Sequence, residues 1–215
     1  MRNLILKAAL LFMSFTLLFS PLHPEAKGKS DPPRPCMDEA SVQLQSAFRK
    51  LWIDHTIWTK SYIVSAISDL DDQEKVLTRL LKNQDDIGNA IKPFYGEDAG
   101  NKLAQLLREH IQLAGKVVEA AKSGNQATYK KYNAEWYKNA DDIALFLSKA
   151  NPNWSQEELK DLLYTHLQLL TDQVSARLKK DTEAEIIAFD KGEDHIIKLA
   201  DVLTKGIIKQ FPKKF

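Results

Sequence analysis

Three histidines are the residues of this chain best suited to chemistry, because they recur at nearly equal intervals. His55, His110 and His166 are 55 and 56 residues apart. Each one ends a short run that begins with leucine, and these runs start at Leu51, Leu106 and Leu162. Such spacing predicts that the three side chains occupy equivalent places in three related segments.

A second signature follows each histidine and contains amide and acidic side chains. It reads Lys-Asn-Gln-Asp-Asp-Ile at 82–87, Lys-Asn-Ala-Asp-Asp-Ile at 138–143 and Lys-Gly-Glu-Asp-His-Ile at 191–196. Imidazole and carboxylate groups together suit several divalent metals. One hypothesis is therefore a metal site, with Asn83 and Asn139 supporting ligands drawn from His55, His110, His166, His195, Asp85, Asp86, Asp141, Asp142 and Asp194.

The alternative is structural, since a buried histidine needs a hydrogen-bond partner on a neighbouring helix. In that case the amides and carboxylates of the second signature, chiefly Asn83, Asn139, Asp85, Asp141 and Asp194, pair with the three histidines. A general acid/base site formed by the same groups is a third interpretation. Four aromatic residues near both signatures also suggest a small-ligand pocket, lined by Trp52, Trp58, Tyr62 and Trp136.

Motifs of the common enzyme classes are absent from the sequence. It has no His-Glu-x-x-His, no glycine-rich phosphate loop, no dinucleotide fingerprint, and no glutamate three residues before any of the four candidate histidines. No serine or cysteine has a nucleophile motif around it. The formal net charge of +1 argues against a nucleic-acid partner. The sequence thus favours a protein that binds a metal or small ligand, or one that acts structurally, over an enzyme.

Apolar residues along the chain recur every three or four positions, the period of one face of a helix. The stripes contain His55, His110 and His166 in three helices, and Ile186, Phe189 and Ile196 in the last one. Turn residues lie midway between each histidine and its second signature. Because residues equidistant from a turn lie side by side in a helical hairpin, each histidine should face its own signature. We predict an all-α, up-and-down bundle of about six helices, built from three hairpin repeats at 38–92, 97–150 and 155–211.

Three pairs of residues have the spacing of capping boxes and mark predicted helix starts. They are Asp71 with Glu74, Ser155 with Glu158, and Thr182 with Glu185. The first helix should start near Asp38.

The first 26 residues have the pattern of a secretory signal peptide. Arg2 and Lys7 precede an apolar run from Ala8 to Phe19, and Ala26 could precede the cleavage site. Residues 27–37 are rich in proline and polar side chains, which predicts a disordered lead-in that contains the single cysteine, Cys36. We expect a secreted protein, or one held at the cell surface if the segment is not cleaved; in that case this segment alone contacts the membrane.

The chain from Leu51 to Phe215 resembles a family of uncharacterised secreted helical proteins of Gram-positive bacteria. The matching segments include the run that ends at His55, the stretch from Asn83 to Gly96, and the run that ends at Pro212. Some members bear the labels glycosyltransferase or acetylglutamate kinase, but this sequence has neither the nucleotide site nor the α/β pattern that those chemistries need. The resemblance implies secretion and an all-helical domain. It leaves the metal, the small ligand and any partner in the cell envelope unidentified.

Overall fold

The computed structural model describes residues 38–215, and these form six long helices and one short 3-10 helix. The helices are α1 (Glu39–Ile67), α2 (Gln73–Tyr95), α3 (Glu97–Lys122), α4 (Gln126–Ala150), α5 (Gln156–Leu178) and α6 (Thr182–Gln210), followed by η1 (Pro212–Lys214). No strand occurs between residues 38 and 215. The prediction of an all-α bundle of about six helices is confirmed. The predicted signal peptide and lead-in, with Cys36, lie outside the described residues.

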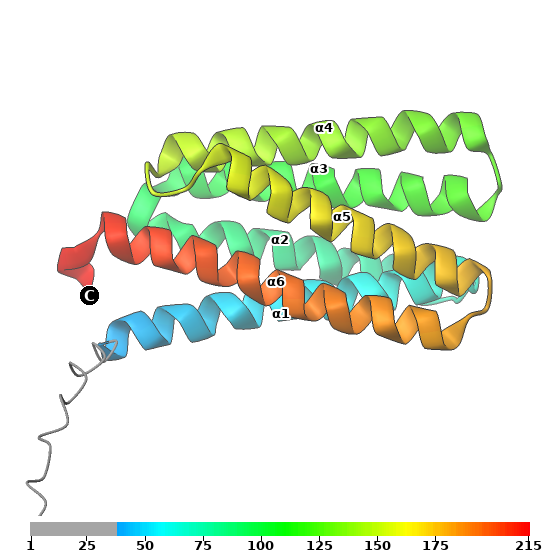
Figure 1. Cartoon of the computed structure of the whole chain (residues 1–215), viewed down its shortest axis with the longest axis horizontal. Helices are drawn as coiled ribbons and strands as arrows, with labels where there is room; N and C mark the ends of the chain where they lie inside the picture. Colours follow the sequence, from blue (N-terminus) through cyan, green and yellow to red (C-terminus); the bar gives the residue numbers. More distant parts are fainter. Residues whose placement is uncertain (1–37) are drawn as a thin grey trace, which may run out of the picture. The chain divides into compact units, whose positions relative to one another are not determined.

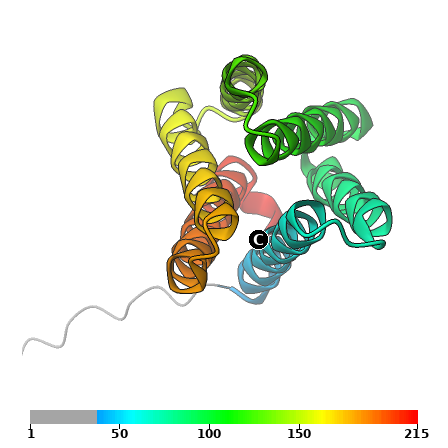
Figure 2. The ribbon, with the colours of Figure 1, turned by 90° about the vertical axis from the view of Figure 1, so that its right-hand side faces the viewer.

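The six helices run up and down and form a closed ring in chain order (Figures 1 and 2). Each helix packs against the next one along the chain, and α6 packs against α1. An ion pair supports this closure, because Arg49 of α1 binds Asp201 of α6 with an N–O distance of 2.6 Å. In the described part of the chain, no helix is long and apolar enough to cross a membrane.

Three turns lie together at one end of the ring, on the right of Figure 1. They connect α1 to α2, α3 to α4, and α5 to α6. We call this the hairpin end. Residues with positive φ make each reversal: Asp69 (53°), Gly124 (69°) and Lys180 (60°). At the opposite end of the ring, the interior is filled by large apolar side chains, including Phe48, Leu103, Leu147, Leu163, Leu203 and Ile207.

The predicted cap at Asp71 is wrong, because α2 begins at Gln73 and its preceding residue is Asp72. Asp72 makes no capping hydrogen bond and instead accepts one from the hydroxyl of Ser65 at 2.7 Å. A tertiary contact to α1 has therefore replaced the local cap.

The predicted cap at Thr182 is also wrong by one residue. Asp181 caps α6 by accepting a hydrogen bond from the backbone N–H of Ala184 at 3.0 Å. Glu185 is buried and binds Arg177 of α5. The predicted cap at Ser155 is confirmed, since its hydroxyl accepts from the N–H of Glu158 at 3.3 Å.

Candidate ligand-binding site

The three spaced histidines meet in the interior of the ring, one from each of α1, α3 and α5. His55, His110 and His166 are 2%, 4% and 3% exposed. The ring centroids of His55 and His166 are 5.5 Å apart, and those of His110 and His166 are 6.4 Å apart. We call these residues the histidine layer. The prediction that they lie at one level of the bundle is confirmed.

His110 has hydrogen-bond partners for both ring nitrogens. Its Nδ1 is 2.7 Å from Oδ1 of Asn139, and its Nε2 accepts from the indole Nε1 of Trp136 at 3.0 Å. Because the indole can only donate, Nε2 carries no proton and Nδ1 must be the donor to Asn139. The tautomer of His110 is thereby determined by two residues of α4.

His55 and His166 are less well bonded than His110. Nδ1 of His55 is 3.3 Å from Nε2 of Gln84, and this amide donates a shorter bond of 2.8 Å to the carbonyl of Leu80. Neither ring nitrogen of His166 has a partner among the described residues. Buried polar groups without partners are uncommon, and each one calls for a physical explanation.

Burial keeps all three imidazoles neutral. Desolvation lowers the pKa of His55 to about 3 and the pKa of His110 to about 4. The same cause, with the nearby His55 and His110 rings contributing, lowers the pKa of His166 well below its usual value. Neutral imidazoles can accept a hydrogen bond, donate one or bind a metal, but they cannot serve as cationic acids near neutral pH.

Residues of the second signature mainly form hydrogen bonds with backbone carbonyls of the partner helix. Asn83, Asn139 and His195 bond the carbonyls of Leu51, Leu106 and Leu162 at 3.0, 3.1 and 2.8 Å. Each carbonyl belongs to the residue four positions before a histidine of the layer. These three bonds occupy equivalent places in the three hairpins, and the repeat of the hairpins stays a prediction. The expectations that Asn83 bonds His55 and that Asp194 bonds His166 are wrong, whereas Asn139 does bond its histidine.

The aspartates of the signature are at least partly exposed, and Asp85 and Asp141 follow Asn83 and Asn139 by two residues, which turns a helix by 200°. Asp85 pairs with Arg108, Asp86 with Lys82, Asp141 with Lys160, Asp142 with Lys138, and Asp194 is exposed. Between residues 38 and 215, no group of three or more His, Cys, Asp or Glu side chains is placed to hold a metal ion. Metal binding therefore stays a prediction.

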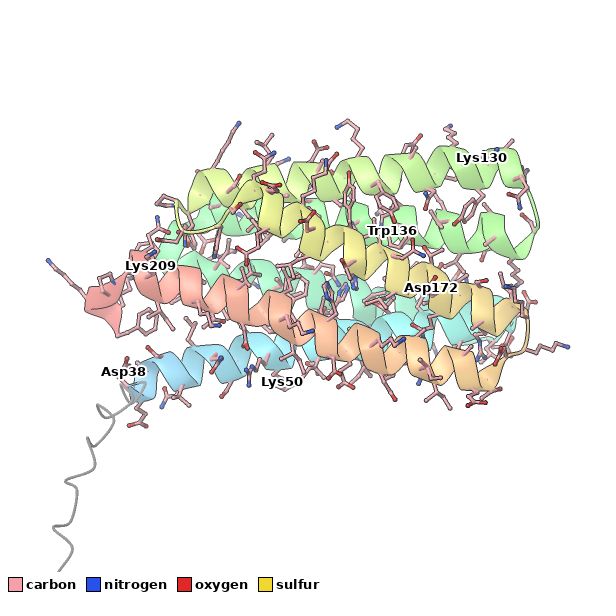
Figure 3. All side chains as sticks on the ribbon, viewed as in Figure 1. Asp38, Lys50, Lys130, Trp136, Asp172 and Lys209 are labelled. Carbon is pink, nitrogen blue, oxygen red and sulfur yellow. The ribbon has the colours of Figure 1, made fainter. Side chains whose placement is uncertain are left out.

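A cavity of about 350 Å³ lies beside the histidine layer, toward the hairpin end. Its wall is mostly aliphatic and aromatic and includes Tyr62, Ile63, Val117, Val118, Leu170 and Val174. Thr59 and Trp136 also line it, and Trp136 is the residue that bonds His110. Lys179 and Gln126, next to two of the turns, form the rim. Figure 3 labels Trp136 on α4, and Lys130 on the outer side of the same helix.

Two of the four aromatic residues predicted to line a ligand pocket do line the cavity. Tyr62 and Trp136 line the cavity. Trp52 instead packs against His55 with ring centroids 5.7 Å apart, and Arg79 lies over the Trp58 ring at 5.0 Å. Sequence reasoning missed the aliphatic wall and the free hydroxyl of Thr59. The small residues Ala114, Ala121 and Ser175 were the available signal, because they leave space where three stripes face one another.

Comparison with protein-family models, with curated proteins and with solved structures gave no match for this chain.

Proposed function

We propose that this protein is a binding module that holds a small, largely apolar molecule inside its ring of helices. The observation that carries the proposal is the cavity of about 350 Å³ between the histidine layer and the hairpin end. That volume falls within the range of about 300–1,000 Å³ that is typical of small-molecule sites. The side chains around an empty space lack contacts on one side, which costs packing energy. A ligand in the cavity would supply those contacts.

The two ends of the ring differ in a way that fits this role. Toward the termini, bulky residues such as Phe48, Leu163 and Ile207 fill the interior and hold the helices together. Toward the hairpin end, five of the six helices contribute residues to the cavity wall. One half therefore serves as the scaffold, and the other half holds the ligand.

The test uses the fluorescent apolar probe N-phenyl-1-naphthylamine, titrated into the full chain. We expect saturable binding, and at least about tenfold weaker binding when Ala121→Phe fills the cavity; tenfold equals about 1.4 kcal/mol. Ser175→Leu fills the same space from α5 and gives an independent second variant. Ala134→Phe, the same change as the first at an exposed site of α4, is the matched control.

Two results would contradict the proposal. One is a wild-type chain that does not bind the probe. The other is probe binding by folded Ala121→Phe and Ser175→Leu that equals the wild type. Either would favour the alternative that the protein acts structurally in the cell envelope, with the histidine layer maintaining helix register.

A second candidate is a transition-metal site at the histidine layer. It is favoured by the two unpartnered nitrogens of His166 and by the 5.5 Å between the His55 and His166 rings. His110 would have to give up its bond to Trp136 to join them. Zn²⁺ or Cu²⁺ added to protein without a histidine tag should then raise stability by about 2.7 kcal/mol at 100 times Kd. His166→Leu should abolish that response and His195→Leu should keep it; an unresponsive wild type would remove this candidate.

We also propose export from the cytoplasm, on the strength of the apolar run from Ala8 to Phe19 and the prolines that follow it. Cell fractionation tests this directly. Recovery of the full-length chain in the cytoplasm would count against export.

A further inference from the structure

Thr59 has a buried hydroxyl without a partner, in the wall of the cavity. The residue lies on α1 one turn after His55, is 4% exposed, and its Oγ1 has no hydrogen bond to any described residue. Three other threonines of the helices donate their hydroxyl to a carbonyl three or four residues earlier. Thr56 donates to Ile53 at 2.8 Å, Thr171 to Leu167 at 2.9 Å and Thr204 to Ala200 at 2.7 Å. The unpaired hydroxyl of Thr59 thus differs from those of these three threonines.

Leaving a buried hydroxyl unpaired destabilises the protein, and a ligand that bonds the hydroxyl recovers that loss. Two other polar groups of the wall already have partners. The indole N–H of Trp136 is donated to His110, and the hydroxyl of Thr171 is donated to Leu167. The hydroxyl of Tyr62 would be 2.9 Å from a Cβ at Gly115, so it lies against α3 within the wall. Among the described residues that line the cavity, Thr59 is the one whose buried polar atom has no partner, so we take it as the group that a ligand would bond.

The surroundings of Thr59 disfavour a charged ligand group. Of the described residues that line the cavity, Lys179 alone carries a charge, and it lies at the rim beside the turn into α6. The neighbouring wall is made of Ile63, Leu80 and Ile111, which offer an ion no counter-charge. An unpaired ion buried there would lose its hydration without compensation.

We propose that the cavity takes an uncharged apolar molecule with one hydroxyl or carbonyl group, and that this group hydrogen-bonds Oγ1 of Thr59. The inference rests on the proposed function and names its ligand class. Thr59 then orients the ligand, with its polar group toward the histidine layer and its apolar body among Val117, Val118 and Val174. A hydrocarbon of the same shape fits the same space but leaves the hydroxyl unpaired.

The experiment compares 2-naphthol with naphthalene, each displacing N-phenyl-1-naphthylamine from the full chain. The measured quantity is the ratio of the two dissociation constants, naphthalene over 2-naphthol. We expect Thr59→Val to lower this ratio by about three- to tenfold relative to the wild type, as the loss of one neutral hydrogen bond predicts. Thr171→Val is the matched control, because it makes the same change in the same wall at a hydroxyl that already has a partner. Its ratio should stay at the wild-type value.

The outcomes separate the inference from the proposed function. If both compounds displace the probe but Thr59→Val leaves the ratio unchanged, or Thr171→Val lowers it equally, the inference is overturned and the proposed function stands. If neither compound displaces the probe from the wild type, and the probe itself does not bind, both fail. Val has nearly the shape of Thr, so Thr59→Val should fold, and its thermal melt checks this.

Discussion

Trp136 of α4 donates its indole N–H to Nε2 of His110 on α3, with 3.0 Å between the nitrogens. The same tryptophan lines the cavity, so one residue connects the histidine layer to the proposed ligand site. Replacing it by phenylalanine removes the donor, leaves Nε2 unpaired and enlarges the cavity.

We expect Trp136→Phe to lower the free energy of unfolding by about 2–4 kcal/mol, measured by urea denaturation. Trp58→Phe is the control, since Trp58 is only half-buried and packs beside Arg79. It should cost less than about 1 kcal/mol. Equal losses of stability in the two variants would show that the bond to His110 does not contribute measurably to the free energy of unfolding.

Acid should destabilise the protein through the histidine layer. The pKa of His55 falls to about 3 and that of His110 to about 4, and the pKa of His166 is also lowered, all because of burial. In the unfolded chain these rings titrate near 6.5, so below that pH the unfolded state binds protons that the folded state does not. The stabilising contribution is complete above pH 6.5 and is lost as the pH falls toward 4.

The expected slope is about 1.4 kcal/mol per pH unit for each ring, or about 4 kcal/mol per unit for all three between pH 5.5 and 4.5. Aspartates such as Asp201, whose pKa is lowered by its bond to Arg49, contribute only at lower pH. Urea denaturation at several pH values measures the slope, and His166→Leu should reduce it by about one third. A free energy of unfolding that is constant between pH 6.5 and 4.5 would contradict the assignment of neutral buried imidazoles.

Two glycines of α6 should respond in opposite directions to the same change. A Cβ at Gly206 would be 1.9 Å from Nε1 of Trp154, which packs there from the loop between α4 and α5. We expect Gly206→Ala to cost about 1–3 kcal/mol through displacement of that ring. Gly192 has open space around it, so Gly192→Ala should stabilise the helix by about 0.5–1 kcal/mol. Thermal unfolding of both variants tests the pair, and a neutral Gly206→Ala would show that Trp154 moves aside freely.

Thr59 and Thr204 should likewise differ when changed to valine. Thr204 is 1% exposed and donates to the carbonyl of Ala200, whereas the hydroxyl of Thr59 is unpaired. Thr204→Val should therefore cost about 1 kcal/mol, and Thr59→Val should be neutral or stabilising without ligand. Calorimetric melts of the two variants are the measurement. A loss of stability in Thr59→Val similar to that in Thr204→Val would mean that its hydroxyl is already satisfied.

The sequence by itself determined the helices, their order and the level of the three histidines. Helical periodicity depends on local geometry, and the nearly equal distances of 15 residues from His110 to Asn125 and 16 residues from Asn125 to Asp141 can be read from the sequence. The bond between His110 and Asn139 is the result that this reasoning predicted best. The caps at Asp71 and Thr182 could not be chosen correctly, because neighbouring aspartates compete and a contact such as that of Ser65 with Asp72 decides between them.

Tertiary structure decided the partners of most other polar groups. Asp85 and Asp141 turn outward to Arg108 and Lys160, since rotation by two residues moves them off the face that carries Asn83 and Asn139. Ile186, expected inside from its stripe, is 50% exposed, because near the start of α6 the buried positions are Glu185 and Ala188.

The cavity also depends on how the six helices close into a ring, which α1 and α6 complete from opposite ends of the described chain. That closure determines whether a space remains beside the small residues Ala114, Ala121 and Ser175. The local sequence pattern does not predict it. Local periodicity therefore indicates which side chains face inward, whereas the distances between helices determine whether those side chains fill the interior.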